Sequence, residues 1–340
     1  MKERPAYGGQ AVIEGVMVRG QRHVSLAVRR PTGDIYTHCE PLHGLYTAPL
    51  RRVPLVRGVI VLAETLVLGA RALNRSAAIA AQGDAADPQE LPRWVFLLTL
   101  GVSLALGIAL FMVAPLVLAS VLERAIPSGL VVNLIEGVIR LGILVGYIGA
   151  IGLMPDIRRV FAYHGAEHMA VHAHEHGDPL DVAHVRRYPT AHPRCGTAFL
   201  LVVVVVSVLL FALLGRPAMV WLVLSRILLV PAIAAISYEF IRFSGVHRTN
   251  PLVRAISAPS LWLQGLTTRQ PDDGQVEVAI RALEVAVAAD GGRAPAEGPQ
   301  VAQPGAPEGG APPSLPRAPG EGPIPRQHLP STDGHQDATR

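Results

Sequence analysis

Charged and aromatic side chains are scarce in this chain of 340 residues: 16% are Asp, Glu, Lys or Arg, and 5% are Phe, Trp or Tyr. Half of the residues are hydrophobic and the mean hydropathy is +0.35, which is more apolar than an average soluble domain. The apolar content is therefore mostly Leu, Val, Ile and Ala, the composition of lipid-facing helices. These shortages argue against a soluble protein and favour a membrane protein.

Cysteine is nearly absent too, since the chain has only Cys39 and Cys195. Both fall in segments predicted below to be cytoplasmic, so we expect reduced thiols rather than a disulfide framework. We also expect no secretory signal peptide, because the N-terminus is polar and Gly-rich and the first long apolar run begins near Trp94. The pI of 9.4 does not indicate nucleic acid, since the basic residues are scattered without interleaved aromatic residues.

Four long apolar segments predict transmembrane helices, at residues 94–122, 130–154, 198–214 and 218–240. Lys and Arg gather before the first segment, between the second and third, and after the fourth. By the positive-inside rule, this distribution places the N- and C-termini in the cytoplasm. The predicted fold class is mainly α: a polytopic, multi-pass helical membrane protein with about four transmembrane helices in a lipid bilayer.

Two segments precede the first predicted span. Residues 1–50 predict a small cytoplasmic β-rich region, because short Val, Ile and Leu runs alternate with polar residues and glycines. The Gly-rich stretch 8–20 lacks the glycine spacing of a nucleotide-binding site. Its glycines favour tight turns or close backbone packing against the histidine-rich segment 155–197, with Glu14 and Arg19 as polar contributors. Residues 51–93 hold an apolar stretch too charged for a span, so we predict an interfacial helix and a linker.

Three further segments lie outside the predicted spans. Residues 155–197 form a cytoplasmic histidine-rich loop, and residues 241–290 a cytoplasmic segment with a short amphipathic helix at Val276–Ala289. Residues 291–340 are rich in Pro and Gly and have almost no large apolar side chains, which predicts a disordered tail.

The motif that carries chemistry is His164-Gly165-Ala166-Glu167-His168. On a helix, the spacing of four residues puts both histidines on one face, where they can share a metal ion. Glu167 beside them can act as general base for a metal-bound water, the logic of the H-x-x-E-H motif of zinc peptidases. The cofactor predicted is a divalent metal, zinc first. The alternative is a solvated histidine-rich surface that holds no metal.

A catalytic zinc site normally has three protein ligands and an open water position, so one more ligand is needed. Glu239 and His192 are the first candidates, because both are predicted at the cytoplasmic edge of the membrane. Cys195 lies in the same layer, although a lone cysteine is more often a small buried residue. His172 extends the helical stripe by one turn.

Four other polar residues are candidates for a role in the site or the membrane. Arg194 and Arg242 can steady an anionic intermediate or a lipid phosphate. Glu136 and Arg140 are four residues apart inside the second predicted span, where they can form a structural ion pair. Ionisable groups at membrane depth also mark functional paths, which Arg226 can join.

Several motifs together resemble the YqhQ-like bacterial membrane proteins: the run Gly8–Met17, Tyr163–His168, His192–Thr197 and Ser237–Arg242. The likeness covers about Pro5 to Ala288. That family is a domain of unknown function whose members are described as metal-dependent enzymes. The resemblance implies a bacterial cytoplasmic (inner) membrane location and a metal site, and it names no reaction and no established catalytic residues.

The leading hypothesis from the sequence is a metal-dependent hydrolase at the cytoplasmic membrane face. Its substrate would be a membrane-associated peptide or a lipid-linked ester. One alternative is a non-enzymatic membrane scaffold or assembly factor that uses the basic face for partners. A second alternative is an ion or metal transporter, for which four spans form a thin pathway unless the protein forms oligomers.

Overall fold

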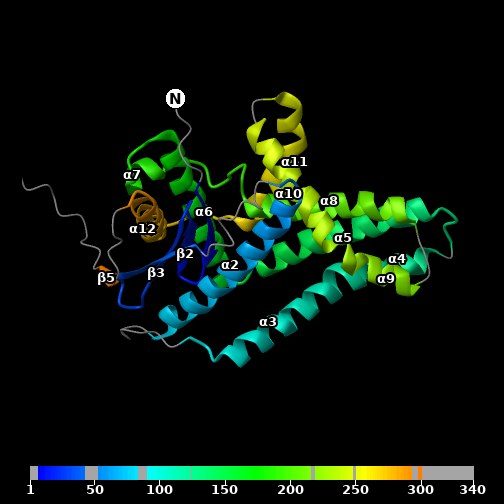
Figure 1. The fold of residues 1–340 in the computed structure, drawn as a ribbon, viewed down its shortest axis with the longest axis horizontal. Helices are drawn as coiled ribbons and strands as arrows, with labels where there is room; N and C mark the ends of the chain where they lie inside the picture. The colour runs from blue at the N-terminus through cyan, green and yellow to red at the C-terminus, as the bar shows by residue number, and fades with distance from the viewer. Residues whose placement is uncertain are drawn as a thin grey trace, which may run out of the picture. The chain divides into compact units, whose positions relative to one another are not determined.

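The computed structural model describes residues 7–42, 53–82, 90–123, 125–215, 219–247, 250–292 and 298–300. The described chain is mainly helical and has a small sheet formed largely by the N-terminal region (Figure 1). The predicted mainly α class with an N-terminal β-containing region is therefore confirmed at this level. Most of the tail predicted to be disordered, residues 291–340, lies outside the described residues.

The sheet is an antiparallel meander. It contains β1 (Gly8–Val12), β2 (Gly15–Arg19), β3 (His23–Arg29) and β4 (Ile35–Pro41), with β5 (Gly298–Gln300) paired to β4. Short connections join the first four strands, as expected for antiparallel neighbours. The strands alternate their side chains between two faces, which explains why apolar residues recur at every second position in the N-terminal sequence.

Helices cover both faces of this sheet (Figure 1). On one face, Met17 packs with residues of α2 (Val56–Gln82). On the other face, its neighbour Val18 packs with α6 (Pro155–His176) and α12 (Asp273–Asp290). Since hydrophobic contacts continue through all three layers, α6 has a firm support on its sheet-facing side.

Among the described residues, three helical segments are long and apolar enough to cross a membrane. The first joins α3 (Arg93–Ile108), a π-helical turn η2 (Ala109–Val113) and α4 (Ala114–Glu123), and the others are α5 (Gly129–Ile151) and α8 (Gly196–Leu214). Their bounds agree with the first three predicted spans to within a few residues. Large apolar side chains remain exposed along them, which fits contact with lipid.

The fourth predicted span differs from a single straight helix. α9 (Met219–Leu228) and α10 (Val230–Val246) are bent by 42° at Leu229, and together they are also long and apolar enough to cross a membrane. Pro231 lies in the first turn of α10. Its ring removes a backbone donor and clashes with the preceding turn, which explains the break. The described part of the chain thus has three candidate spans, or four if the bent pair is one span.

Other segments differ from the predictions in helix content. The segment 155–197 was predicted as a loop, but its first half is the 22-residue helix α6, followed by the short α7 (Val182–Val185). After α10 comes α11 (Pro251–Thr267), which the hydropathy pattern did not indicate. The short amphipathic helix predicted at Val276–Ala289 is slightly longer in the structure, as α12, and it packs against the sheet.

Candidate metal centre

Helix α6 presents a row of imidazoles. His164, His168, His172 and His176 recur at every fourth residue, so they follow one side of the helix. The helix ends at Gly177, whose positive φ of 86° provides the left-handed cap. Because the sheet and α12 bury other faces of α6, the histidine row is held in a defined direction.

The first two histidines of the row have a fixed proton position. His164 Nδ1 lies 2.9 Å from the carbonyl oxygen of Thr267, and His168 Nδ1 lies 2.6 Å from that of Thr190. A carbonyl oxygen can only accept, so both Nδ1 atoms donate a proton. In the neutral form of each ring, Nε2 then carries the lone pair. Metal-binding histidines in proteins are oriented by this kind of hydrogen bond.

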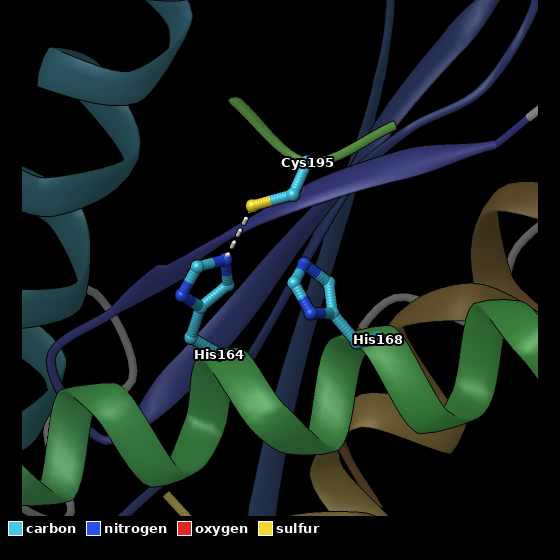
Figure 2. Close-up of side chains that lie close together, drawn as sticks. All are labelled: His164, His168 and Cys195. Carbon is cyan, nitrogen blue, oxygen red and sulfur yellow. Dashed lines mark hydrogen bonds between the residues drawn. The ribbon is translucent and has the colours of Figure 1, made fainter. Parts of the chain in front are cut away.

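Cys195 completes a group of three ligand atoms. Its Sγ lies 3.2 Å from His164 Nε2, and the two histidines and the thiol each offer one atom within 4.8 Å of the others (Figure 2). Cys195 is the N-cap of α8, and the backbone amide of Thr197 donates to Sγ over 3.4 Å. The partial positive charge of a helix N-terminus favours an anionic ligand there.

Glu167 lies beside this group without belonging to it. Its carboxylate is buried, and Oε2 is 3.6 Å from His168 Nε2. Strand β1 passes over it at Gly9, where an added Cβ atom would lie 2.7 Å from Glu167 Cγ. The prediction that N-terminal glycines allow close packing against the histidine segment is confirmed at Gly9.

Gly165 explains why glycine follows the first histidine of the motif. A Cβ atom at this position would collide with the carbonyl oxygen of Arg269. The close approach is fixed by a hydrogen bond from the Arg269 amide to the carbonyl of Phe161, 2.9 Å long. The same contact holds the end of α11 against α6, which brings the Thr267 carbonyl to His164.

His172, Glu175 and His192 form a second group whose ligand atoms lie within 4.8 Å of one another. Its hydrogen bonds differ from those of the first group. The Arg194 amide donates to His192 Nδ1 over 3.2 Å, so Nδ1 is the unprotonated nitrogen and Nε2 carries the proton. That Nε2 lies 3.4 Å from Glu175, which is also paired with the Arg194 guanidinium.

His172 also has a different environment. Its Nε2 lies 3.0 Å from the carbonyl of Ala191. Burial lowers its pKa to about 4, an effect that the Ala191 hydrogen bond partly opposes and that the neighbouring histidines reinforce. His172 therefore stays neutral to well below physiological pH.

The prediction that Glu239 supplies the third ligand is not supported by its position. Both carboxylate oxygens bond to the guanidinium of Arg57, and Oε1 also accepts from the Leu55 amide over 3.0 Å. The paired carboxylate is therefore directed toward α2. Arg242, the predicted anion-binding residue on the same helix, is exposed.

Glu136 and Arg140 do form the predicted ion pair, at 2.7 Å, and Arg226 joins them by bonding to the same carboxylate at 3.1 Å. All three side chains are buried. Arg140 also donates to the Phe111 carbonyl and to the Ser207 hydroxyl. This network connects four helical segments, η2, α5, α8 and α9.

The two polar residues of the Gly-rich stretch bind different helices. Glu14 accepts two hydrogen bonds from Arg159 and one from the Tyr163 hydroxyl, both on α6. The Arg159 hydrogen bonds hold the Glu14 pKa below its usual value, although burial opposes this. Arg19 pairs with the buried Glu64 of α2 at 2.8 Å. These ion pairs tie the sheet to the helices on both of its faces.

Two cavities meet at the first histidine group. The larger, of about 770 Å³, extends between α5, α8 and α10, and the smaller, of about 380 Å³, lies between β1, α2 and α6. His164 and Cys195 line both cavities. Glu167, His168 and Arg194 line the smaller one. The candidate ligand atoms are thus accessible from two directions.

Sequence reasoning missed the groups that orient the site. Backbone carbonyls of Thr190 and Thr267 have no signature in a sequence, because any residue type offers one. Gln264 was missed as well: its buried amide clamps the His192 backbone through two hydrogen bonds, of 2.8 and 2.9 Å. Glu175 follows His172 by three residues, and that helical spacing was a signal that could have found it.

Residues 53–289 match a protein family described as "Protein of unknown function (DUF1385)". The chain belongs to this family. It is also 32% identical over 297 residues to the "Uncharacterized protein YqhQ" of Bacillus subtilis (strain 168), covering 83% of this chain and 92% of the relative. No solved structure matches the chain. The family resemblance predicted from the motifs is confirmed, and the matched region contains both histidine groups.

Proposed function

We propose that this protein is a metal-dependent hydrolase at the cytoplasmic face of the bacterial inner membrane. The observation that supports it most directly is the orientation of His164 and His168. Each donates its Nδ1 proton to a backbone carbonyl and directs the Nε2 lone pair to the space beside Cys195. Two imidazoles and one thiolate suit zinc and leave a fourth position open.

The remaining residues have distinct roles in this proposal. A bound zinc ion would supply Lewis acidity, which lowers the pKa of a water molecule. Glu167 would hold that water and accept its proton, since the carboxylate is close to His168 Nε2 and is not a member of the ligand group. Arg194 lines the smaller cavity together with Glu167 and His168, and it would attract an anionic group of the substrate.

The substrate class proposed is a membrane-associated peptide or a lipid-linked ester. The larger cavity supports the lipid alternative, because it joins His164 and Cys195 to the apolar space between candidate spans. The transporter alternative would use Glu136, Arg140 and Arg226, whose hydrogen bonds hold them in one network. The scaffold alternative requires no metal, so metal content tests it directly.

The test is metal analysis of the full-length protein purified in detergent without chelators. We expect one zinc ion per chain in the wild type, a loss in His168→Ala and retention in Glu167→Gln. His176→Ala is the matched control, because it removes an exposed histidine from the same row. A wild type without stoichiometric metal, or equal metal in His168→Ala, would overturn the proposed site.

A second measurement separates hydrolysis from metal binding alone. In a strain that lacks the gene, Glu167→Gln should retain the metal and fail to restore the wild-type phenotype, because the proton acceptor is lost. If this variant binds metal and fully restores the wild-type phenotype, general-base catalysis by Glu167 is wrong. That result would support the alternative of a non-enzymatic scaffold.

A further inference from the structure

The larger cavity contains a positive charge that the hydrogen-bonded groups around it do not balance. Arg140 and Arg226 both line the cavity, and among the described residues no Asp or Glu lines it. Both arginines bond to a single carboxylate, that of Glu136. The network joins two cations to one anion, so one positive charge remains.

Arg226 has an unused donor in this network. The side chain is 2% exposed, and its Nη1 is a buried atom with no hydrogen-bond partner in the described part of the chain. Its guanidinium lies over the Phe211 ring, with Cζ 3.7 Å from the ring centroid. A buried donor on an excess cation is unfavourable without a partner, so this end of the cavity favours an anion.

The break between α9 and α10 places the arginine at the cavity. Arg226 lies in the last turn of α9, while Val230, Ile233 and Ala234 of α10 line the same space. Broken helices are tolerated in membranes where they line a cavity or a binding site. The bend of 42° is therefore part of the cavity wall.

The rest of the cavity is mostly apolar and long. Leu144 and Ile148 of α5 and Val203 and Val204 of α8 are among its lining residues. Along α8 the lining runs from Gly196 to Phe211, which at 1.5 Å per residue is roughly 23 Å, most of the thickness of a bilayer's hydrocarbon core. This length accommodates an extended alkyl chain better than a compact polar molecule.

We propose that this cavity binds an anionic amphiphile, a long alkyl chain that ends in a carboxylate or a phosphate. The acid group accepts hydrogen bonds from Arg226, and the chain lies between α5, α8 and α10. This inference goes beyond the proposed hydrolase, because binding requires neither the metal nor a reaction. The two proposals therefore fail separately.

The experiment titrates the purified full-length protein, in nonionic detergent, with a fluorescent long-chain carboxylate. Competitors are a long-chain alkyl phosphate, the corresponding long-chain alcohol, and inorganic phosphate. We expect one site per chain, with the alcohol at least about tenfold weaker because it lacks the charge-assisted hydrogen bond. The relative affinities of carboxylate and phosphate distinguish a fatty acid from a phospholipid as the natural ligand.

Two variants test the two ends of the site. Arg226→Gln should weaken acid binding at least about tenfold and leave alcohol binding nearly unchanged. Val203→Trp should abolish binding of every chain by filling the cavity. Val205→Trp is its matched control, since Val205 is 51% exposed on the same helix and does not line the cavity.

Equal affinity for acid and alcohol in the wild type would overturn the anion site. If inorganic phosphate displaced the probe as effectively as the alkyl phosphate, binding of the alkyl chain would be wrong. If Val203→Trp and Val205→Trp had equal effects, the assignment of the site to this cavity would be wrong. If Arg226→Gln does not fold, the comparison of acid with alcohol and the two tryptophan variants still decide. Metal content, measured alongside, is expected to be unchanged in all variants.

Discussion

The two histidine groups on α6 contain similar residue types, but only one is arranged like a metal site. In the first, His164 and His168 donate Nδ1 protons to carbonyls and expose two Nε2 lone pairs. In the second, His192 accepts a backbone proton at Nδ1, which leaves a protonated Nε2 facing Glu175. The groups supporting each ring, rather than its spacing along the chain, therefore determine its chemistry.

The acidic neighbours show the same contrast. Glu167 is buried beside the first group, where its carboxylate lies 3.6 Å from His168 Nε2. Glu175 in the second group is paired with the guanidinium of Arg194. A carboxylate that already neutralises an arginine is a weaker ligand for a cation. We therefore expect the first group to bind zinc and the second group to pack beside it without binding metal.

Removing one candidate ligand from each group should show most clearly which of the two groups binds the metal. Cys195→Ala should lower zinc affinity by more than about 100-fold, since the loss of supporting groups alone costs about 10–100-fold. Glu175→Ala is the paired variant and should change the affinity by less than about threefold. Competition with a chromophoric chelator measures both. A larger loss in Glu175→Ala than in Cys195→Ala would mean that the metal occupies the second group.

A smaller effect is expected when the support of the first group is displaced. Gly165→Ala would push the Arg269 carbonyl away from α6 and shift the Thr267 carbonyl that orients His164. We expect a loss of zinc affinity of about 10- to 100-fold, the range for supporting hydrogen bonds. The same competition assay measures it. Gly149→Ala is the control, because an added Cβ atom at Gly149 meets nothing within 4 Å. Unchanged affinity in Gly165→Ala would show that the Thr267 hydrogen bond is not needed.

Much of the fold follows from patterns that the sequence displays directly. The spans were predicted because lipid selects long apolar runs, and the N-terminal strands because apolar residues alternate with polar ones. The pairing of His164 with His168 followed from helical spacing alone. The π-helical turn and the bend at Leu229 change the local backbone without changing the hydropathy. Pro231 is a sequence signal for the bend, whereas the π-helical turn has no such signal.

The site was harder to predict where distant segments meet. Glu239 was preferred as a ligand because it was placed in the same membrane layer as the histidines, but a layer does not specify direction, and Arg57 binds its carboxylate. Cys195 was ranked below it as a lone cysteine. Its selection depends on the start of α8 lying opposite His164, a tertiary contact that no local pattern encodes.

The smallest expected effect concerns the acid stability of the second group. The folded pKa of His172 is about 4, below the value of about 6.5 in an unfolded chain. Above about pH 6.5 both states are neutral and the contribution to stability is complete; as the pH falls toward 4, the unfolded chain binds a proton first and that contribution is lost. Metal-free His172→Gln protein should therefore lose less melting temperature between about pH 7 and pH 5 than the wild type, while the exposed-site control His176→Gln should lose as much. Equal losses in wild type and His172→Gln would show that burial in the folded protein does not lower the His172 pKa.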